Sequence, residues 1–187
     1  LTTATHSNSH AGYYPGAIPL SVKLMFAPVT GRLYGAQVVG YKGVDKRIDQ
    51  LAVLIKMKGT VADLMALEHA YAPPFSSAKD PIAIAAYSAN NILNGSMPII
   101  TWRELAAKDF SRLTLLDVRT VDEFSLGSLA GAINIPHTDI RERLDEIPTD
   151  KPIVIYCAIG LRGYLAQRVL MEHGFTNVQN LSGGCKT

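Results

Sequence analysis

The sequence is poor in cysteine and has no long apolar run. It holds two cysteines, Cys157 and Cys185, in 187 residues, which is too few for a disulfide scaffold and fits a reducing compartment. Any role for these thiols is therefore chemical rather than mechanical. No stretch approaches the roughly 20 uncharged apolar residues that cross a bilayer, and residues 1–10 are polar where a secretory signal is apolar. We expect a cytoplasmic protein with no membrane partner.

Neither sign of charge dominates. Lys and Arg number 18 against 16 acidic residues, a formal net charge of +2 at pH 7, and no basic run is interleaved with aromatic residues. Nucleic acid is therefore not expected as a partner. Residues 1–95 also lack cysteine, a Gly-x-Gly-x-x-Gly loop and the spacing of a metal site. His6 and His10 are four residues apart, but the residues between them favour a loop, so solvated histidines are expected rather than metal ligands.

Apolar residues, in contrast, are plentiful. They make up 48% of the chain, which is enough to build cores without disulfides or metals. The sequence opens at Leu1 without a methionine and stops at Thr187, shortly after a Gly-Gly turn. We therefore expect a piece of a longer protein.

The first half has the pattern of an α+β unit that ends near Gly95. Thr30-Gly31 is a turn signal between two strand-like runs, which predicts a hairpin. Asp80-Pro81 supplies an N-cap and a first-turn proline for a helix, and Thr60 with Asp63 resembles a capping pair for a shorter one. The expected strands are 21–26 and 33–39, and the expected helices are 44–57, 60–69 and 81–93. This unit is predicted to be a domain over residues 1–95.

After a short link that contains Gly and Pro, strands and helices alternate. Thr101 and Glu104 form a capping box that opens a second domain, residues 99–187. The expected strands are 113–118, 132–135, 153–156 and 178–181, with helices at 140–147 and 163–173. This alternation predicts a parallel sheet covered on both faces, which is a three-layer α/β domain. The whole chain is therefore expected to be α/β, with an α+β domain followed by a parallel-sheet domain.

Cys157 stands where a strand, a tight loop and a helix follow one another. Ligands of open parallel sheets gather at the carboxyl ends of strands, and Cys157 directly follows the strand 153–156. Gly160 permits backbone conformations that turn several N–H groups inward, and with the helix N-terminus these groups would form a cradle for an anion. Arg162 is expected to add a positive charge to it. The predicted active-site loop is Ala158, Ile159, Gly160, Leu161, Arg162 and Gly163, around the catalytic Cys157.

Such a cradle favours a thiolate over a thiol. Cysteines in comparable settings have pKa values of about 3.5 to 7.5, against about 8.5 when free. The thiolate could attack a sulfane sulfur, and the same N–H groups would hold the resulting persulfide anion. Two alternatives stay open. One is a buried structural cysteine, and the other is a cysteine phosphatase, which normally has five residues between its Cys and Arg, where this sequence has four. The shorter loop suits a small sulfur anion better than a tetrahedral phosphate.

Other candidate groups lie near this loop. Asp117, Arg119 and Glu123 are close in sequence and could be catalytic, but opposite charges at this spacing more often pair with one another to fix a loop after a strand. Cys185 follows the last predicted strand, on the same edge of the sheet as Cys157. It is either a redox partner that resolves a persulfide into a disulfide or a solvent-exposed bystander.

Ordered motifs in the second half carry a family resemblance. They are Leu116-Asp-Val-Arg119, Glu123-Phe124, Gly131-Ala-Ile-Asn-Ile-Pro136, Tyr156-Cys157 and Leu181-Ser-Gly-Gly184. They resemble the motifs of the rhodanese homology family over nearly all of this half. The resemblance implies a sulfurtransferase that forms a persulfide on Cys157. One departure is Ser128, where the family commonly has a histidine, usually a structural one.

Three segments of the first half carry a second resemblance: 10–15, 35–49 and 71–81. They are similar to the dimerisation domain of flavin-dependent pyridine nucleotide-disulfide reductases, in the coenzyme A disulfide reductase and NADH oxidase branch. The resemblance implies a homodimer, with FAD, NAD(P)H and coenzyme A serving the full-length protein and no cofactor in this piece itself. Tyr13 and Tyr71 would line the coenzyme A thiol site of the partner subunit, because phenols can donate to a sulfur anion. Interface packing is the alternative role, and Tyr14 is nearly as good a candidate as Tyr13.

Together the two resemblances imply part of an FAD- and NAD(P)H-dependent reductase of coenzyme A disulfides, persulfides or polysulfide. The chain itself would carry the sulfurtransferase site, whose partner is a small sulfane-sulfur donor or coenzyme A persulfide. The alternative is a rhodanese module that binds a persulfide or a protein partner without turnover.

Overall fold

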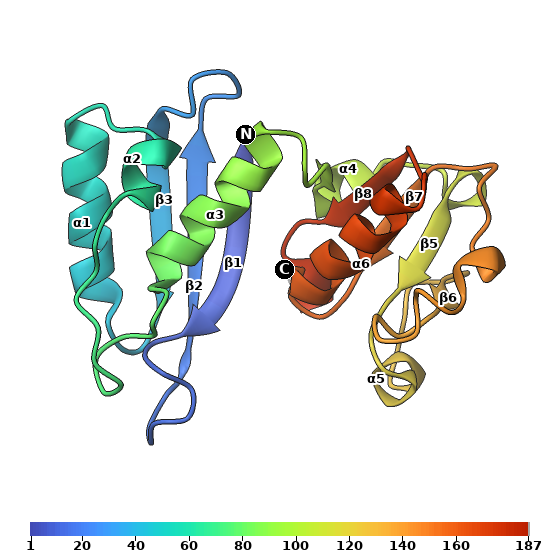
Figure 1. Cartoon of the computed structure of the whole chain (residues 1–187), viewed down its shortest axis with the longest axis horizontal. Helices are drawn as coiled ribbons and strands as arrows, with labels where there is room; N and C mark the ends of the chain where they lie inside the picture. Colours follow the sequence, from blue (N-terminus) through green and yellow to red (C-terminus); the bar gives the residue numbers. More distant parts are fainter. Residues whose placement is uncertain (187) are drawn as a thin grey trace. The chain divides into compact units, whose positions relative to one another are not determined.

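The computed structural model describes residues 1–186 and divides into two compact units, Leu1–Asn94 and Gly95 onward. In the first unit, β1 (Thr2–Asn8), β2 (Pro19–Phe26) and β3 (Leu33–Gly40) form an antiparallel sheet in that order. The helices of this unit are α1 (Val44–Lys56), α2 (Val61–Met65) and α3 (Pro81–Leu93). They lie on one face of the sheet (Figure 1).

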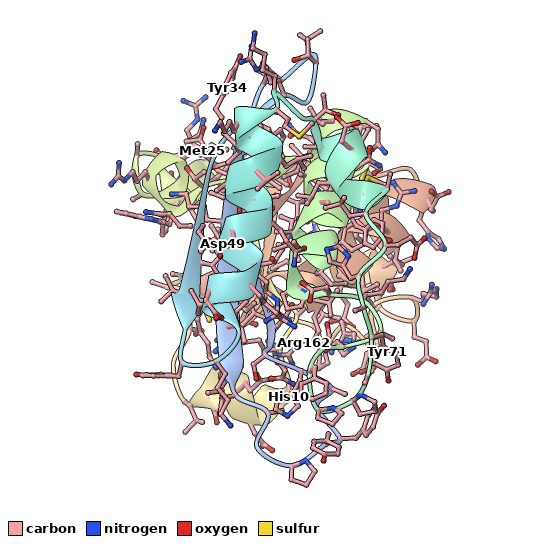
Figure 2. The ribbon with its side chains drawn as sticks, turned by 90° about the vertical axis from the view of Figure 1, so that its left-hand side faces the viewer. His10, Met25, Tyr34, Asp49, Tyr71 and Arg162 are labelled. Atoms are coloured by element: carbon pink, nitrogen blue, oxygen red, sulfur yellow. The ribbon has the colours of Figure 1, made fainter. Side chains whose placement is uncertain are left out.

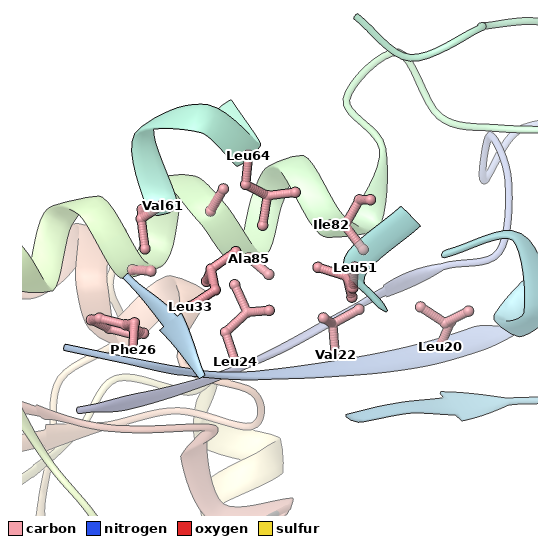
Figure 3. Packing of buried hydrophobic residues seen from close by; sticks show 12 residues of the cluster. Leu20, Val22, Leu24, Phe26, Leu33, Leu51, Val61, Leu64, Ile82 and Ala85 are labelled. Atoms are coloured by element: carbon pink, nitrogen blue, oxygen red, sulfur yellow. The ribbon is translucent and has the colours of Figure 1, made fainter. Parts of the chain in front are cut away.

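The first core lies between this sheet and its helices (Figure 3). Every second residue of β2 is buried, because successive side chains of a strand point to opposite faces. These β2 residues are Leu20, Val22, Leu24 and Phe26. The helix residues packed in the same core include Leu51, Val61, Leu64, Ile82 and Ala85.

A buried ion pair joins α1 to the start of α3. The Arg47 guanidinium donates hydrogen bonds to both carboxylate oxygens of Asp80, at 2.9 to 3.2 Å. Its remaining donors reach the main-chain oxygens of Ser9 and Gly43, each at 2.9 Å. Asp80 also caps α3, since its carboxylate accepts from the Ile82 N–H at 3.1 Å. The N-cap expected at Asp80 is therefore confirmed, and it is tied to α1 as well.

The predicted hairpin and the two longer helices of this unit are confirmed, but β1 is not expected from the sequence. Its residues are mostly polar because it is an edge strand that pairs only with β2. Thr3 faces the helices, where its hydroxyl lies 2.8 Å from that of Ser88. The expected helix at 60–69 is shorter than predicted and ends at Met65.

The second unit is built on a five-stranded parallel sheet in the order β4-β8-β7-β5-β6. Its strands are β4 (Ile99–Ile100), β5 (Thr114–Asp117), β6 (Ile133–Asn134), β7 (Ile153–Tyr156) and β8 (Val178–Leu181). Its helices are α4 (Trp102–Ala106), α5 (Val121–Ser125) and α6 (Leu161–Glu172), with 3-10 turns η1 (Phe110–Arg112), η2 (Leu144–Glu146) and η3 (Gly184–Lys186). Buried side chains form two clusters, one containing Ile155 and Ala166, the other Tyr156 and Leu105. Both faces of the sheet are thus covered, and the expected α/β fold is confirmed.

The helix expected at 140–147 is wrong. Ile140 and Ile147 are both buried, as their spacing suggested, but turns and the short η2 bring them inward. Conversely, α5 is not expected, although Thr120 and Glu123 form a complete capping box at its start. A helix of five residues is too short to show apolar periodicity.

Candidate active site

Cys157 directly follows β7, the middle strand of the sheet, at its carboxyl end. The tight loop that follows ends at Gly160, which has a φ of 98° and is the N-cap of α6. This backbone conformation strains any residue with a side chain, so glycine is required there. The Gly160 N–H donates a hydrogen bond of 3.2 Å to the Cys157 sulfur, whose residue is fully buried. The sulfur, a main-chain donor and the N-terminus of α6 therefore come together.

The charge expected from Arg162 is not a free one. Its guanidinium donates to both carboxylate oxygens of Glu123, at 2.6 and 2.7 Å, so an ion pair lies beside the loop. Hydrogen bonds from Arg162 lower the pKa of Glu123 to about 2. Glu123 in turn raises the pKa of Arg162, and the Cys157 thiol adds a smaller contribution of the same sign. The guanidinium is therefore close to the sulfur as well as to Glu123.

Asp117 and Arg119 form a separate pair. The buried Asp117 carboxylate accepts from Arg119 Nε at 3.0 Å and from the second guanidinium nitrogen at 2.6 Å. Arg119 also donates to the Gly127 carbonyl at 2.7 Å, which fixes the segment after α5. The pairing predicted for Asp117 and Arg119 is confirmed, whereas Glu123 pairs with Arg162 instead.

Cys185 lies next to the active-site loop along the backbone. Its N–H donates to the Cys157 carbonyl at 2.9 Å, and both cysteines are free. Cys185 is exposed. The backbones of the two cysteines are therefore adjacent, but Cys157 is buried and Cys185 is exposed.

In the first unit, the phenol oxygens of Tyr13 and Tyr71 lie 2.7 Å apart and share a hydrogen bond. This bond raises the pKa of Tyr71. Both rings are exposed, and Figure 2 shows Tyr71 at the end of the unit where His10 also lies. Tyr14 instead meets His10 edge-on, with ring centroids 6.0 Å apart. The structure therefore brings Tyr13, rather than Tyr14, to Tyr71.

The expectation of solvated histidines is wrong for His10. It is 6% exposed, and its ring nitrogens lie 3.1 Å from the Ser9 hydroxyl and 3.3 Å from the Pro15 carbonyl. The Nδ1 atom of His6 lies 2.8 Å from the hydroxyl of Ser21. Within residues 1–186, no group of three or more His, Cys, Asp or Glu residues is arranged to hold a metal ion. None of the helices in that range has the length and apolar character needed to cross a membrane.

The sequence singled out Glu123 but not its pairing with Arg162, and it gave no sign of Asn180. Glu123 pairs with Arg162. The capping box with Thr120 is a sequence signal that places Glu123 at the start of a helix, but it does not reveal that Arg162 is its partner. Asn180 of β8 donates to the Gly160 carbonyl at 3.0 Å, and nothing in its sequence neighbourhood marks it. Both contacts join segments far apart in the chain.

Family models match both halves of the chain. Residues 101–187 match the rhodanese-like domain, and residues 1–81 match the dimerisation domain of pyridine nucleotide-disulphide oxidoreductases. Coenzyme A disulfide reductase of Staphylococcus epidermidis is 46% identical over 81 residues, which are 43% of this chain and 18% of the relative. The uncharacterized protein YqhL of Bacillus subtilis is 39% identical over 90 residues, which are 48% of this chain and 71% of the relative. Fold and site thus define the second unit as a rhodanese-like domain.

Solved structures match the two units together. CoADR-RHD of Bacillus anthracis, in its reduced form, is 47% identical over the whole of this chain, with a TM-score of 0.96. The NAD-dependent persulfide reductase of A. fulgidus is 40% identical over the whole chain, with a TM-score of 0.87. This chain thus joins a segment that matches the dimerisation domain of pyridine nucleotide-disulphide oxidoreductases to a rhodanese-like domain, and both solved structures match it over the two parts. It spans 33% of the length of each of these two structures.

Proposed function

We propose that this chain carries the sulfurtransferase site of a longer flavoprotein, and that Cys157 is the sulfur carrier. The hydrogen bond from the Gly160 N–H to the buried Cys157 sulfur, at the N-terminus of α6, is the observation that supports this most. Main-chain donors and the positive end of a helix stabilise a thiolate relative to a thiol. The thiolate is the nucleophile that accepts a sulfane sulfur.

The proposed step moves one sulfur atom. With thiosulfate as the donor, the Cys157 thiolate attacks the outer sulfur, the S–S bond of thiosulfate breaks, and sulfite leaves with the electron pair of that bond. The product is a persulfide anion on Cys157, which the loop amides hold as they held the thiolate. A nucleophilic acceptor such as cyanide or a thiolate then takes the outer sulfur and restores Cys157.

Mass spectrometry after incubation with thiosulfate tests this step. The peptide that contains Cys157 is expected to gain about 32 Da, the mass of one sulfur atom. Cys157→Ser should show no gain, and Cys185→Ser should gain as much as the unchanged chain. Absence of the gain from the unchanged chain would overturn the proposal.

Two other functions make different predictions. A cysteine phosphatase would hydrolyse a phosphate ester and would not retain sulfur. A binding module would take up sulfur once but show no steady-state thiosulfate:cyanide turnover, whereas the proposed transferase turns over. The four-residue spacing between Cys157 and Arg162 favours the sulfur anion over phosphate.

We also propose that the longer protein is a homodimer that uses FAD and NAD(P)H to reduce disulfides or persulfides of coenzyme A. The names of the relatives support this, and so does the match to a dimerisation domain. The first unit has an antiparallel sheet and no Gly-x-Gly-x-x-Gly loop, so it lacks the features of a parallel-sheet dinucleotide site. FAD and NAD(P)H would therefore be held by other residues of the longer protein.

In that longer protein, the hydrogen-bonded pair of Tyr13 and Tyr71 would donate one hydrogen bond to the sulfur of a coenzyme A thiolate in the partner's site. Their mutual hydrogen bond supports this, because it leaves one phenol proton free to donate outward. Tyr71→Phe should slow disulfide or persulfide reduction by the full-length enzyme. An unchanged rate would argue for interface packing, and analytical ultracentrifugation of the full-length enzyme tests the dimer.

A further inference from the structure

The segment 180–186, which includes the end of β8, lies along the active-site loop and donates to three of its carbonyls. The Cys185 N–H donates to the Cys157 carbonyl at 2.9 Å, and the Lys186 N–H donates to the Ala158 carbonyl at 3.2 Å. Asn180 Nδ2 donates to the Gly160 carbonyl at 3.0 Å. The loop is therefore anchored through its oxygens, from one side.

This anchoring decides which way the loop amides point. In a planar trans peptide, the carbonyl of one residue and the N–H of the next point in opposite directions. Holding the carbonyls of Cys157, Ala158 and Gly160 toward the 180–186 segment therefore turns the N–H groups of Ala158, Ile159 and Leu161 away from it. The Ile159–Gly160 peptide lies between two peptides that are anchored in this way. The Gly160 N–H, within the same loop, donates to the Cys157 sulfur.

Asn180 supplies the one side chain among these three donors. It is 3% exposed, and within residues 1–186 its Oδ1 atom has no hydrogen-bond partner. A side chain added at Gly163 would collide with that same oxygen. The amide of Asn180 is thus confined between the Gly160 carbonyl and the Cα atom of Gly163.

We propose that Asn180 is a positioning residue of the Cys157 site, which holds Gly160 in the left-handed conformation that aims its N–H at the sulfur. This inference rests on the proposed sulfurtransferase function and adds a residue to that site. Gly163 belongs to the same device, because only glycine leaves room for the Asn180 amide. The donor is the part of Asn180 that matters, because the Gly160 carbonyl can only accept, so a side chain without a hydrogen-bond donor cannot replace Asn180.

The test is the pH dependence of alkylation of Cys157 by iodoacetamide, in the full chain with Cys185→Ser as the background. Asn180→Ala is expected to raise the pH of half-maximal alkylation rate by about one pH unit, since one donor that orders the amides around the thiolate is lost. Gly163→Ala should raise it as well, because it displaces the amide without removing it. This second variant keeps the test informative if Asn180→Ala does not fold.

Gln179→Ala is the matched control. Gln179 is the neighbour of Asn180 on β8, and its side-chain amide also donates to a main-chain carbonyl, that of Ile99, at 3.1 Å. It should leave the alkylation profile unchanged. A profile in Asn180→Ala and Gly163→Ala that matches the background would overturn the positioning role. An ordinary thiol profile in the background itself, with half-maximal rate near about pH 8.5, would instead overturn the proposed function.

Discussion

The carboxylate of Glu123 on α5 and the guanidinium of Arg162 on α6 form a bidentate ion pair, with N–O distances of 2.6 and 2.7 Å. The same carboxylate accepts from the Thr120 N–H at 3.0 Å and so completes the capping box of α5. One side chain therefore closes a helix and holds the arginine that lies beside Cys157. The stability of α5 and the orientation of Arg162 are linked through Glu123.

Glu123→Gln is expected to remove an acid-sensitive part of the stability of the second unit. The pKa of Glu123 is lowered from 4.5 to about 2 in the folded chain. The ion pair therefore stabilises the fold above about pH 4.5, and this stabilisation is lost as the pH falls toward 2. Because the Glu123 side chain is 36% exposed, solvent screening limits the effect to about 1 kcal/mol. The single tryptophan, Trp102, lies in α4, so its fluorescence during urea unfolding reports on this unit.

Glu146→Gln is the control for this prediction. Glu146 pairs with Arg143 in a similar geometry, but away from the loop and with the arginine side chain 36% exposed. Between about pH 7 and about pH 3, the unchanged chain should lose more stability than Glu123→Gln does. An equal loss of stability in the unchanged chain and in Glu123→Gln would show that the pair with Arg162 contributes nothing.

The sequence is sufficient to predict features that depend on neighbouring residues, and insufficient for those set by distant ones. The capping box at Thr101 and the N-cap at Asp80 are local, and both are found in the structure. Gly160 is marked by its place between a strand and a helix. The partner of Arg162, by contrast, is 39 residues away in sequence, and its carboxylate changes an expected free charge into an ion pair.

The pattern of polar and apolar residues explains the main differences between the predicted and the observed fold. The edge strand β1 needs only one apolar face, and there a buried threonine hydroxyl, that of Thr3, pairs with Ser88. Its pattern therefore resembles a loop. Around Ile140 and Ile147 the pattern predicts a regular element that is not there. The two residues have the spacing of a helix, but turns bury them instead.

Asp80→Asn should destabilise the first unit by about 3 to 5 kcal/mol, since it leaves the buried Arg47 charge without a counter-charge. Burial opposes ionisation of Asp80, but hydrogen bonds from Arg47, Ile82 and Ser76 outweigh it and lower the pKa of Asp80. Asn at this position can still cap α3, so the loss reports on the ion pair. Amide hydrogen exchange in α1 and α3 measures it.

Two controls test whether the effect of Asp80→Asn is specific to the buried ion pair. Asp63→Asn, at the exposed capping box of α2, should cost clearly less. The urea transition followed by Trp102 fluorescence should not change, because Trp102 belongs to the other unit. Exchange rates in α3 that match those of the unchanged chain would contradict a stabilising role for the pair.

Mild oxidation is expected to leave Cys157 and Cys185 uncrosslinked. Their backbones are close enough for a bridge, because one hydrogen bond joins them. However, the Cys157 sulfur is buried against the Gly160 N–H, whereas Cys185 is exposed. A thiol reagent should therefore modify Cys185 first. Detection of a Cys157–Cys185 disulfide by mass spectrometry would establish Cys185 as a redox partner.

Tyr13→Phe should lower the pKa of Tyr71. The hydrogen bond with Tyr13 is the main cause of the raised pKa of Tyr71, and burial adds a smaller contribution of the same sign. Removing the Tyr13 hydroxyl leaves only that smaller contribution, so the pKa of Tyr71 should move back toward 10.0, the ordinary value. Titration followed by the NMR signals of the Tyr71 ring measures the shift. Tyr14→Phe is the matched control, since Tyr14 packs on His10 and should leave the Tyr71 titration unchanged. If both variants leave that titration as it was, the two phenols do not share a hydrogen bond in solution, and the support for a paired donor to a thiolate is lost.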